Sequence, residues 1–96
     1  YQGCELWNLS LVDPDNRRPV DYAQRERMLR VLEAEFPEDG VDRSDAVAAL
    51  LAEPADGRIK MLLMRRLLAL RSRDPDLFAR GGYRPLDVHG ERAEHV

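Results

Sequence analysis

Apolar residues recur at helical spacing in three stretches of the 96-residue chain, and the first stretch covers residues 21–36. Asp21 is a suitable N-terminal cap for a helix here, and Gln24 stands three residues later, where it completes a capping box. Pro37 cannot continue a helix, so the run ends before it. The apolar residues that would face a core are Met28, Leu29, Leu32 and Phe36.

Two further helices follow, and the third carries the strongest apolar pattern of the chain. Either Asp42 or Ser44 can cap the second helix, which Pro54 ends; its apolar residues are Val47, Leu50 and Leu51. Asp56 opens the third helix, predicted over residues 56–73. Its apolar stripe is too wide for a helix with one face in water, so we expect neighbours on more than one side. The stripe consists of Ile59, Leu62, Leu63, Leu67 and Leu70, widened by Met61, Met64 and Leu68.

The patterning changes after the third helix. Asp74 and Pro75 end that helix and begin a short helical turn, because Asp is a good cap and Pro suits the first helical position. We expect Leu77 and Phe78 to anchor this turn, and a glycine pair closes it. Residues 83–89 then alternate with a period of two, which predicts a strand that leads into a turn and a possible hairpin.

Charge and composition narrow the classes of partner. The net charge is −3, and the arginines alternate with acidic residues, so no basic stripe forms and we expect no nucleic-acid partner. No run of about 18 apolar residues occurs, so we expect no membrane partner either. The start of the chain lacks the pattern of a signal peptide. Cys4 is the only cysteine, which excludes an internal disulfide and suits the reducing cytoplasm, where we expect the protein.

The chain lacks the patterns of a complete catalytic or metal site. Glu5, Asp13 and Asp15 are carboxylates, but their spacing does not place a pair across a bond, and turn-forming residues are the commoner case. His89 and His95 have no Cys or carboxylate at metal-ligand spacing. The glycines match neither the dinucleotide fingerprint nor a phosphate-binding loop. We therefore expect no catalytic residues, metal or cofactor within these 96 residues.

The first 18 residues are polar and aromatic enough to bind a ligand. They read as a connection with at most a short strand near residues 9–12 and a turn at 13–16. Hydrogen-bond donors and flat aromatic faces together are the groups that a sugar-binding wall needs. The candidates are Tyr1, Trp7, Asn16, Arg17 and Arg18. In the alternative interpretation, which composition alone favours, these arginines pair with neighbouring aspartates in a structural turn.

Several segments resemble the α-amylase family of glycoside hydrolases. YQGCEL (1–6) is similar to the segment after the eighth barrel strand, and LSLVDPDNRRPVDY (9–22) resembles one branch of that family closely. DGRIK (56–60), LLALRSRDPDLF (67–78) and GGYRPL (81–86) follow in the same order, so the resemblance covers most of the chain. Cys4 and Asn8 depart from the Thr and Asp that the pattern carries, which affects local hydrogen bonds more than membership.

The resemblance implies a place within a (β/α)8 barrel enzyme, so we expect a mainly α fragment. Residues 1–20 would be the loop after barrel strand eight, and residues 21–55 a helical insertion. Residues 56–80 would be the last barrel helix with its short helical turn. Residues 81–96 would start a C-terminal β domain with its first strand or hairpin.

The branch that the resemblance indicates converts the reducing-end α-1,4 bond of a maltooligosaccharide into an α,α-1,1 bond. Its two catalytic carboxylates would lie upstream of this chain, so we expect the 96 residues to be inactive alone, with the rest of the parent chain as partner. A different hypothesis is a free-standing helical module that binds a protein through the apolar face of residues 56–73. Both hypotheses allow self-association through that face.

Overall fold

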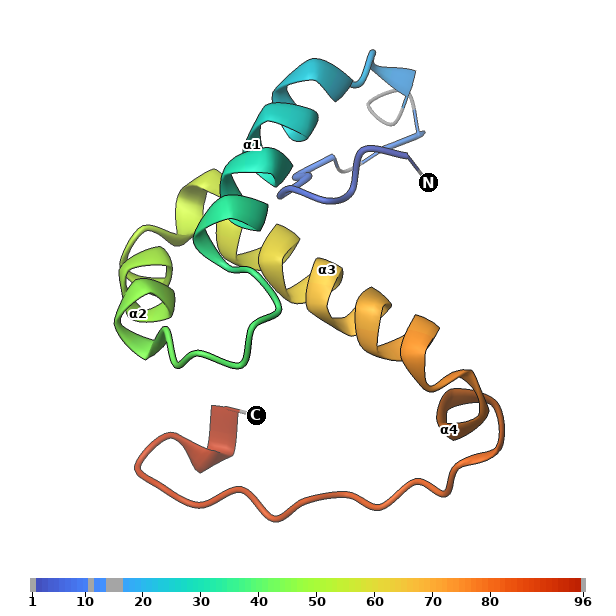
Figure 1. The fold of residues 1–96 in the computed structure, drawn as a ribbon. Coiled ribbons are helices and arrows are strands. Elements are labelled where there is room, and N and C mark those ends of the chain that lie inside the picture. The colour runs from blue at the N-terminus through green and yellow to red at the C-terminus, as the bar shows by residue number, and fades with distance from the viewer. Residues whose placement is uncertain (1, 11, 14–16, 96) are drawn as a thin grey trace.

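The computed structural model describes residues 2–10, 12–13 and 17–95, and the described residues form helices and connections without a strand. Figure 1 shows α1 lying across the first turns of α3, with α2 beside them, while the far end of α3 leads to α4. The chain after α4 returns below the helices as an extended segment (Figure 1). The elements are α1 (Tyr22–Glu35), α2 (Ser44–Ala52), η2 (Pro54–Asp56), α3 (Arg58–Arg73), α4 (Pro75–Arg80) and η3 (Ala93–His95).

Helix α1 begins and ends where its capping residues predict. The carboxylate of Asp21 accepts a hydrogen bond from the backbone N–H of Gln24 at 2.8 Å. At the other end the N–H of Phe36 donates to the carbonyl of Leu32 at 2.8 Å, and Pro37 follows. The predicted helix over residues 21–36 is confirmed to within one residue at each end.

Helices α2 and α3 each begin after an aspartate that binds the first helical N–H. Asp42 Oδ1 accepts from the N–H of Ser44 at 2.9 Å and from its hydroxyl, and these bonds lower the pKa of Asp42. The cap position itself is held by Arg43 and not by either predicted residue: Asp42 precedes it, and Ser44 is the first residue of α2. Asp56 Oδ1 accepts from the N–H of Arg58 at 2.9 Å, and α3 starts there, two residues later than predicted.

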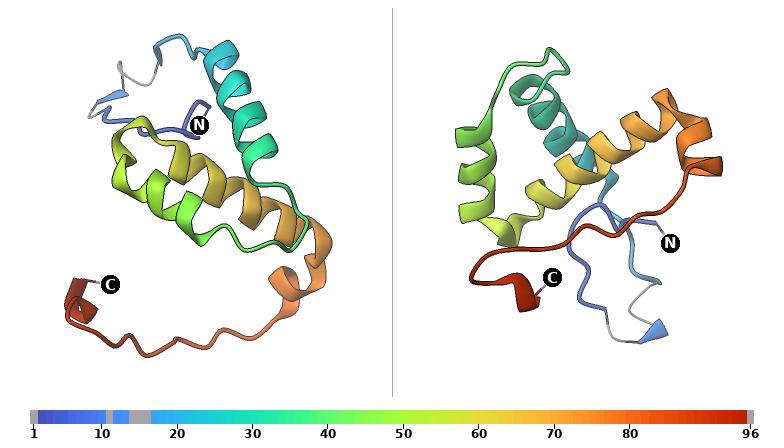
Figure 2. Two further views of the ribbon diagram at one scale, coloured as in Figure 1. Left: turned by 60° about the vertical axis from the view of Figure 1, so that its left-hand side comes forward. Right: turned by 90° about the horizontal axis from the view of Figure 1, so that it is seen from below.

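A small apolar core lies where α1, α2 and the first turns of α3 meet. Leu32 of α1 is fully enclosed, with 0% of its surface exposed. Helix α3 packs against both α1 and α2, and the three helices surround the core in the views of Figure 2. The buried residues are Leu6, Leu32, Phe36, Leu50, Met61 and Leu62, with Met28, Leu29, Val47 and Ile59 packed against them.

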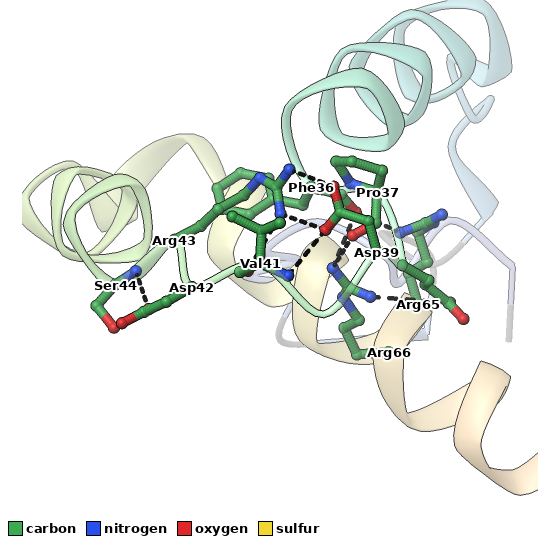
Figure 3. Close-up of polar contacts among 10 residues, drawn as sticks. Phe36, Pro37, Asp39, Val41, Asp42, Arg43, Ser44, Arg65 and Arg66 are labelled. Atoms are coloured by element: carbon green, nitrogen blue, oxygen red, sulfur yellow. Dashed lines mark hydrogen bonds and ion pairs between the residues drawn. The ribbon is translucent and has the colours of Figure 1, made fainter.

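Polar contacts order the connection between α1 and α2 (Figure 3). Arg66 of α3 donates to the carbonyls of Phe36 and Pro37 at 2.9 and 3.1 Å. Further along, both guanidinium Nη atoms of Arg43 donate to the Asp39 carboxylate at 2.7 Å. This bidentate pair, together with the N–H of Val41, holds the pKa of Asp39 well below its usual range.

The end of the chain is less packed than the sequence predicts. Leu77 and Phe78 of α4 are 60% and 49% exposed, so the prediction that they anchor this helix is wrong. The predicted strand over 83–89 and the short strand near residues 9–12 are also not formed among the described residues. A strand needs a neighbour for its hydrogen bonds, and every residue from 81 to 92 is exposed.

The described residues also contain no helix long and apolar enough to cross a membrane.

Candidate functional site

Residues 2–10 form a loop that α1 holds on one side. Arg25 Nη2 donates to the carbonyl of Gly3 at 2.7 Å, and its Nε donates to Glu5 Oε2 at 3.0 Å. The Tyr22 hydroxyl donates to Gln2 Oε1 at 2.8 Å. The Arg25 side chain is only 19% exposed, so its contacts are shielded from solvent competition. Helix α1 thus sets the path of residues 2–5.

Helix η2 and the first turn of α3 hold the same loop from the other side. The indole Nε1 of Trp7 donates to the carbonyl of Pro54 at 2.5 Å, and Lys60 Nζ donates to the carbonyl of Leu6 at 2.9 Å. The Lys60 ammonium also lies 5.2 Å from the centroid of the Trp7 ring, within the range of a cation–π interaction. Leu6 itself is buried in the core. The loop is therefore anchored at a point 47 to 54 residues away along the chain.

A polar cavity of about 140 Å³ lies between this loop and the start of α1. Trp7 and Arg18, two of the predicted site residues, both line it. Asn8 and Ser10 form a local turn on the same wall, in which Asn8 Oδ1 accepts from the N–H of Ser10 at 3.1 Å and from its hydroxyl. The lining consists of Gln2, Gly3, Trp7, Asn8, Ser10, Arg18, Pro19, Val20 and Arg25.

Arg17 is placed differently from Arg18. Its guanidinium Nη2 lies 2.6 Å from Asp13 Oδ2, and both side chains are mostly exposed. This is the contact that the structural-turn interpretation predicts for Arg17, and Arg17 does not line the cavity. The remaining predicted candidates, Tyr1 and Asn16, lie outside the described residues.

The described carboxylates of this region are engaged in ion pairs. Glu5 pairs with Arg25 and Asp13 pairs with Arg17, whereas Asp15 lies outside the described residues. Across the described ranges no group of three His, Cys, Asp or Glu side chains could hold a metal ion. The residues that line the cavity offer hydrogen bonding and stacking.

Sequence reasoning missed several residues that shape this site. Lys60 is the only lysine of the chain and part of the DGRIK segment. That segment supports the family resemblance, but its sequence does not indicate what Lys60 contacts. Arg25 reads as one of many helix-surface arginines, although it binds the loop. Asn8 departs from the family pattern, yet its side-chain oxygen organises a turn, as an aspartate oxygen would. These contacts join residues distant in sequence, so local patterns do not reveal them.

Larger hollows lie along α3, and their linings are mainly apolar. One of about 530 Å³ runs between the end of α1, α2 and α3, over side chains that include Val47, Leu51 and Leu63. Another of about 400 Å³ lies on the other side of α3, over Met64 and Leu68. Charged side chains also line both hollows, but most of their exposed wall is apolar, whereas the wall of the smaller cavity is mainly polar. An apolar wall suits protein contacts better than a sugar.

Comparison with known proteins gives matches to two long sequences. Two proteins of Mycobacterium tuberculosis, from strains CDC 1551 / Oshkosh and ATCC 25618 / H37Rv, are each provisionally named maltooligosyl trehalose synthase. Each is 36% identical to this chain over 96 residues, which is 100% of the chain but 9% of the relative. No family model matches the chain, and no solved structure matches it. The chain is thus similar, over its whole length, to a small part of a much longer protein.

Proposed function

We propose that this chain is part of a maltooligosyltrehalose synthase, an intramolecular transferase of trehalose biosynthesis. The observation that carries the proposal is the 36% identity that extends over all 96 residues to proteins with that name. The enzyme would convert the reducing-end α-1,4 bond of a maltooligosaccharide into an α,α-1,1 bond. We place it in the cytoplasm, where its single free cysteine stays reduced.

The proposed reaction retains configuration and uses two carboxylates outside these 96 residues. One attacks the anomeric carbon and forms a glycosyl-enzyme, while the other protonates the departing glucose oxygen. The freed glucose turns and attacks with its anomeric hydroxyl, whose proton passes to the second carboxylate. The glucose must be retained and water excluded for this to succeed. A wall that holds sugar hydroxyls and stacks on a sugar ring serves that purpose.

We assign residues 2–20 to one wall of the sugar site. Trp7, a residue that is 51% exposed, offers an aromatic surface, and Arg18 brings guanidinium donors to the same cavity. A cavity of about 140 Å³ holds part of a ligand, so the remaining walls would come from the rest of the parent chain. Tyr1, Asn16 and Arg17 remain candidates for further contacts within this assignment.

Steady-state kinetics of the full-length enzyme on maltopentaose test the assignment. Arg18→Ala should lower kcat/KM about tenfold or more, because a hydrogen bond from a charged group contributes roughly 1.5–3 kcal/mol. Arg27→Ala is the matched control, since Arg27 is an exposed arginine of α1 that does not line the cavity. Equal kinetics for the two variants would remove Arg18 from the sugar site. Trehalose-ended product formed by the 96-residue chain alone would contradict the proposal that both catalytic carboxylates lie outside it.

A protein-interaction module remains the second candidate, because several leucines of α3 are uncovered. Leu63, Leu67 and Leu68 are 57%, 50% and 57% exposed, although they belong to the predicted apolar stripe. In the enzyme this face would contact the rest of the parent chain. As a free module it would bind another protein or a second copy. Full catalytic activity of the parent enzyme after Leu67→Glu and Leu68→Glu would favour the module.

A further inference from the structure

The geometry points to a positioning role for η2 and the first turn of α3: the segment Pro54–Lys60 holds Trp7 so that its indole presents a fixed surface to a sugar ring, and Lys60 is the positioning residue. This inference rests on the proposed function, because it takes the maltooligosaccharide as the ligand of the cavity that Trp7 lines. It assigns a role to the DGRIK segment, which lies outside the candidate wall in sequence and touches it in space.

The first contact fixes the direction of the indole. Trp7 Nε1 donates to the carbonyl of Pro54 at 2.5 Å, and this uses the single donor that a tryptophan side chain has. The indole N–H is therefore occupied within the protein. What Trp7 can offer a ligand is its aromatic surface, which suits the apolar face of a sugar ring.

Lys60 contacts both the peptide group that joins Leu6 to Trp7 and the ring of Trp7. Its ammonium donates to the carbonyl of Leu6, which is the peptide oxygen next to Trp7, at 2.9 Å. The same ammonium lies 5.2 Å from the ring centroid. One cation thus restrains both the backbone and the ring of Trp7, and it occupies space over one ring face. A sugar would stack on the surface left exposed, where Trp7 lines the cavity.

Gly57 allows the close approach that these contacts need. Its backbone φ is +80°, and a Cβ added there would lie 3.1 Å from Leu6 Cδ2 and 3.3 Å from Leu6 Cα. A side chain at this position would therefore press against the backbone that carries Trp7, as well as strain its own. Asp56 completes the arrangement, because it binds the N–H of Arg58 and sets the start of α3.

Lys60→Met is the test variant, because it keeps an unbranched side chain of similar length and removes the ammonium. In the full-length enzyme KM for maltopentaose should rise about two- to fivefold, the range expected for losing an exposed cation–π contact. We expect kcat to stay near the wild-type value, since the reacting groups are not touched. Lys60→Arg keeps a cation and a donor, so it should restore KM.

A spectroscopic readout separates positioning from general stability. Trp7 is the only tryptophan of the 96-residue chain, so its fluorescence there reports on this residue alone. Lys60→Met should raise acrylamide quenching and lower the anisotropy of Trp7, while far-UV circular dichroism stays unchanged. Gly57→Ala should alter the Trp7 signal too. Gly40→Ala is its control, because Gly40 also has a positive φ of 74° but nothing lies within 4 Å of an added Cβ.

The outcomes distinguish this inference from the proposed function. Unchanged Trp7 quenching in Lys60→Met overturns the positioning role, whatever the kinetics. Altered quenching with a raised KM that Lys60→Arg restores supports it. If Trp7→Ala in the full-length enzyme leaves KM unchanged, the carbohydrate contact itself is wrong, and the inference falls together with that part of the proposed function.

Discussion

The two halves of α3 have similar sequences and different surroundings. Met61 and Leu62 in the first half are 5% and 6% exposed, whereas Leu67 and Leu68 in the second half are 50% and 57% exposed. The first half lies beneath α1 and beside α2, and the second half extends away from them towards α4 (Figure 1). An apolar stripe therefore predicts which face of a helix avoids water, but it does not predict which partner covers that face.

The size of the molecule reflects the same difference. Its radius of gyration is 16.2 Å, whereas a compact domain of this length would have a value of about 12.5 Å. Helix α4 and the extended segment after it account for the excess, since they lie away from the core (Figure 2). The first region has the interior of a folded domain. The second region carries apolar residues of the kind found in a protein interior, but no other part of the described structure covers them.

Truncation of a leucine in each region gives the largest expected contrast. Leu32→Ala should lower the free energy of unfolding by about 2–5 kcal/mol, because Leu32 is fully enclosed and a cavity would remain. Leu67→Ala should change it by only about 0.5 kcal/mol, because half of that residue is already exposed. Urea unfolding followed by circular dichroism measures both.

One result for these two leucine variants would contradict the comparison between the packed and the uncovered half of α3. Equal losses for the two variants would mean that the second half of α3 is covered in solution. Repeating the measurement at several protein concentrations would then identify self-association, because the stability of an associated state depends on concentration. If Leu32→Ala is unfolded without urea, Leu32→Val provides a smaller step at the same position.

The residues that precede α1 and α4 provide a second test of the same contrast, with a smaller expected loss of stability. Asp21→Ala should cost about 1 kcal/mol, since the Asp21 carboxylate accepts from the N–H of Gln24 at the start of α1. Asp74 precedes α4 in the same way but makes no side-chain capping bond, so Asp74→Ala should leave stability unchanged. Thermal unfolding of the two variants checks this. A comparable loss for Asp74→Ala would show that the cap of α4 forms in solution.

The smallest expected effect is a dependence on pH at the connection between α1 and α2, where Asp39 is exposed. The pKa of Asp39 is held low in the folded state, first by its hydrogen bonds from Arg43. A lowered folded-state pKa contributes stability above the unfolded value of about 4 and loses it as the pH falls below that value. Wild type should therefore be more stable than Asp39→Asn at neutral pH, and the difference should shrink on acidification. A difference that stays constant would show that the carboxylate charge contributes nothing.

Local chemistry predicts the helices well, because each boundary depends on nearby residues. Pro37 and Pro54 end two helices, and Asp21 starts one, as their side chains and fixed φ angles dictate. The strand over 83–89 fails for the opposite reason. Its alternating pattern predicts a strand with two different faces, but no segment among the described residues pairs with it.

The candidate site is predicted in part. Trp7 and Arg18 could be proposed from their chemistry, and both line the cavity. The roles of Lys60 and Arg25 could not, because each depends on a contact that spans at least 20 residues. The position of Arg17 was open between two interpretations, since an arginine near two aspartates can pair locally or reach a ligand. Only the fold shows which contact it makes.

Two arginines of α3 bind the C-terminal end of α1, and this links the unfolding of the two helices. The last turn of α1 contains no basic residue, and the guanidinium groups that reach the carbonyls of Phe36 and Pro37 come from Arg65 and Arg66. The negative end of the α1 dipole is thus neutralised by another helix. When α3 separates, α1 loses its packing and its terminal charge together. We therefore expect the two helices to open as one cooperative unit, so that their amide hydrogens exchange with solvent as a group.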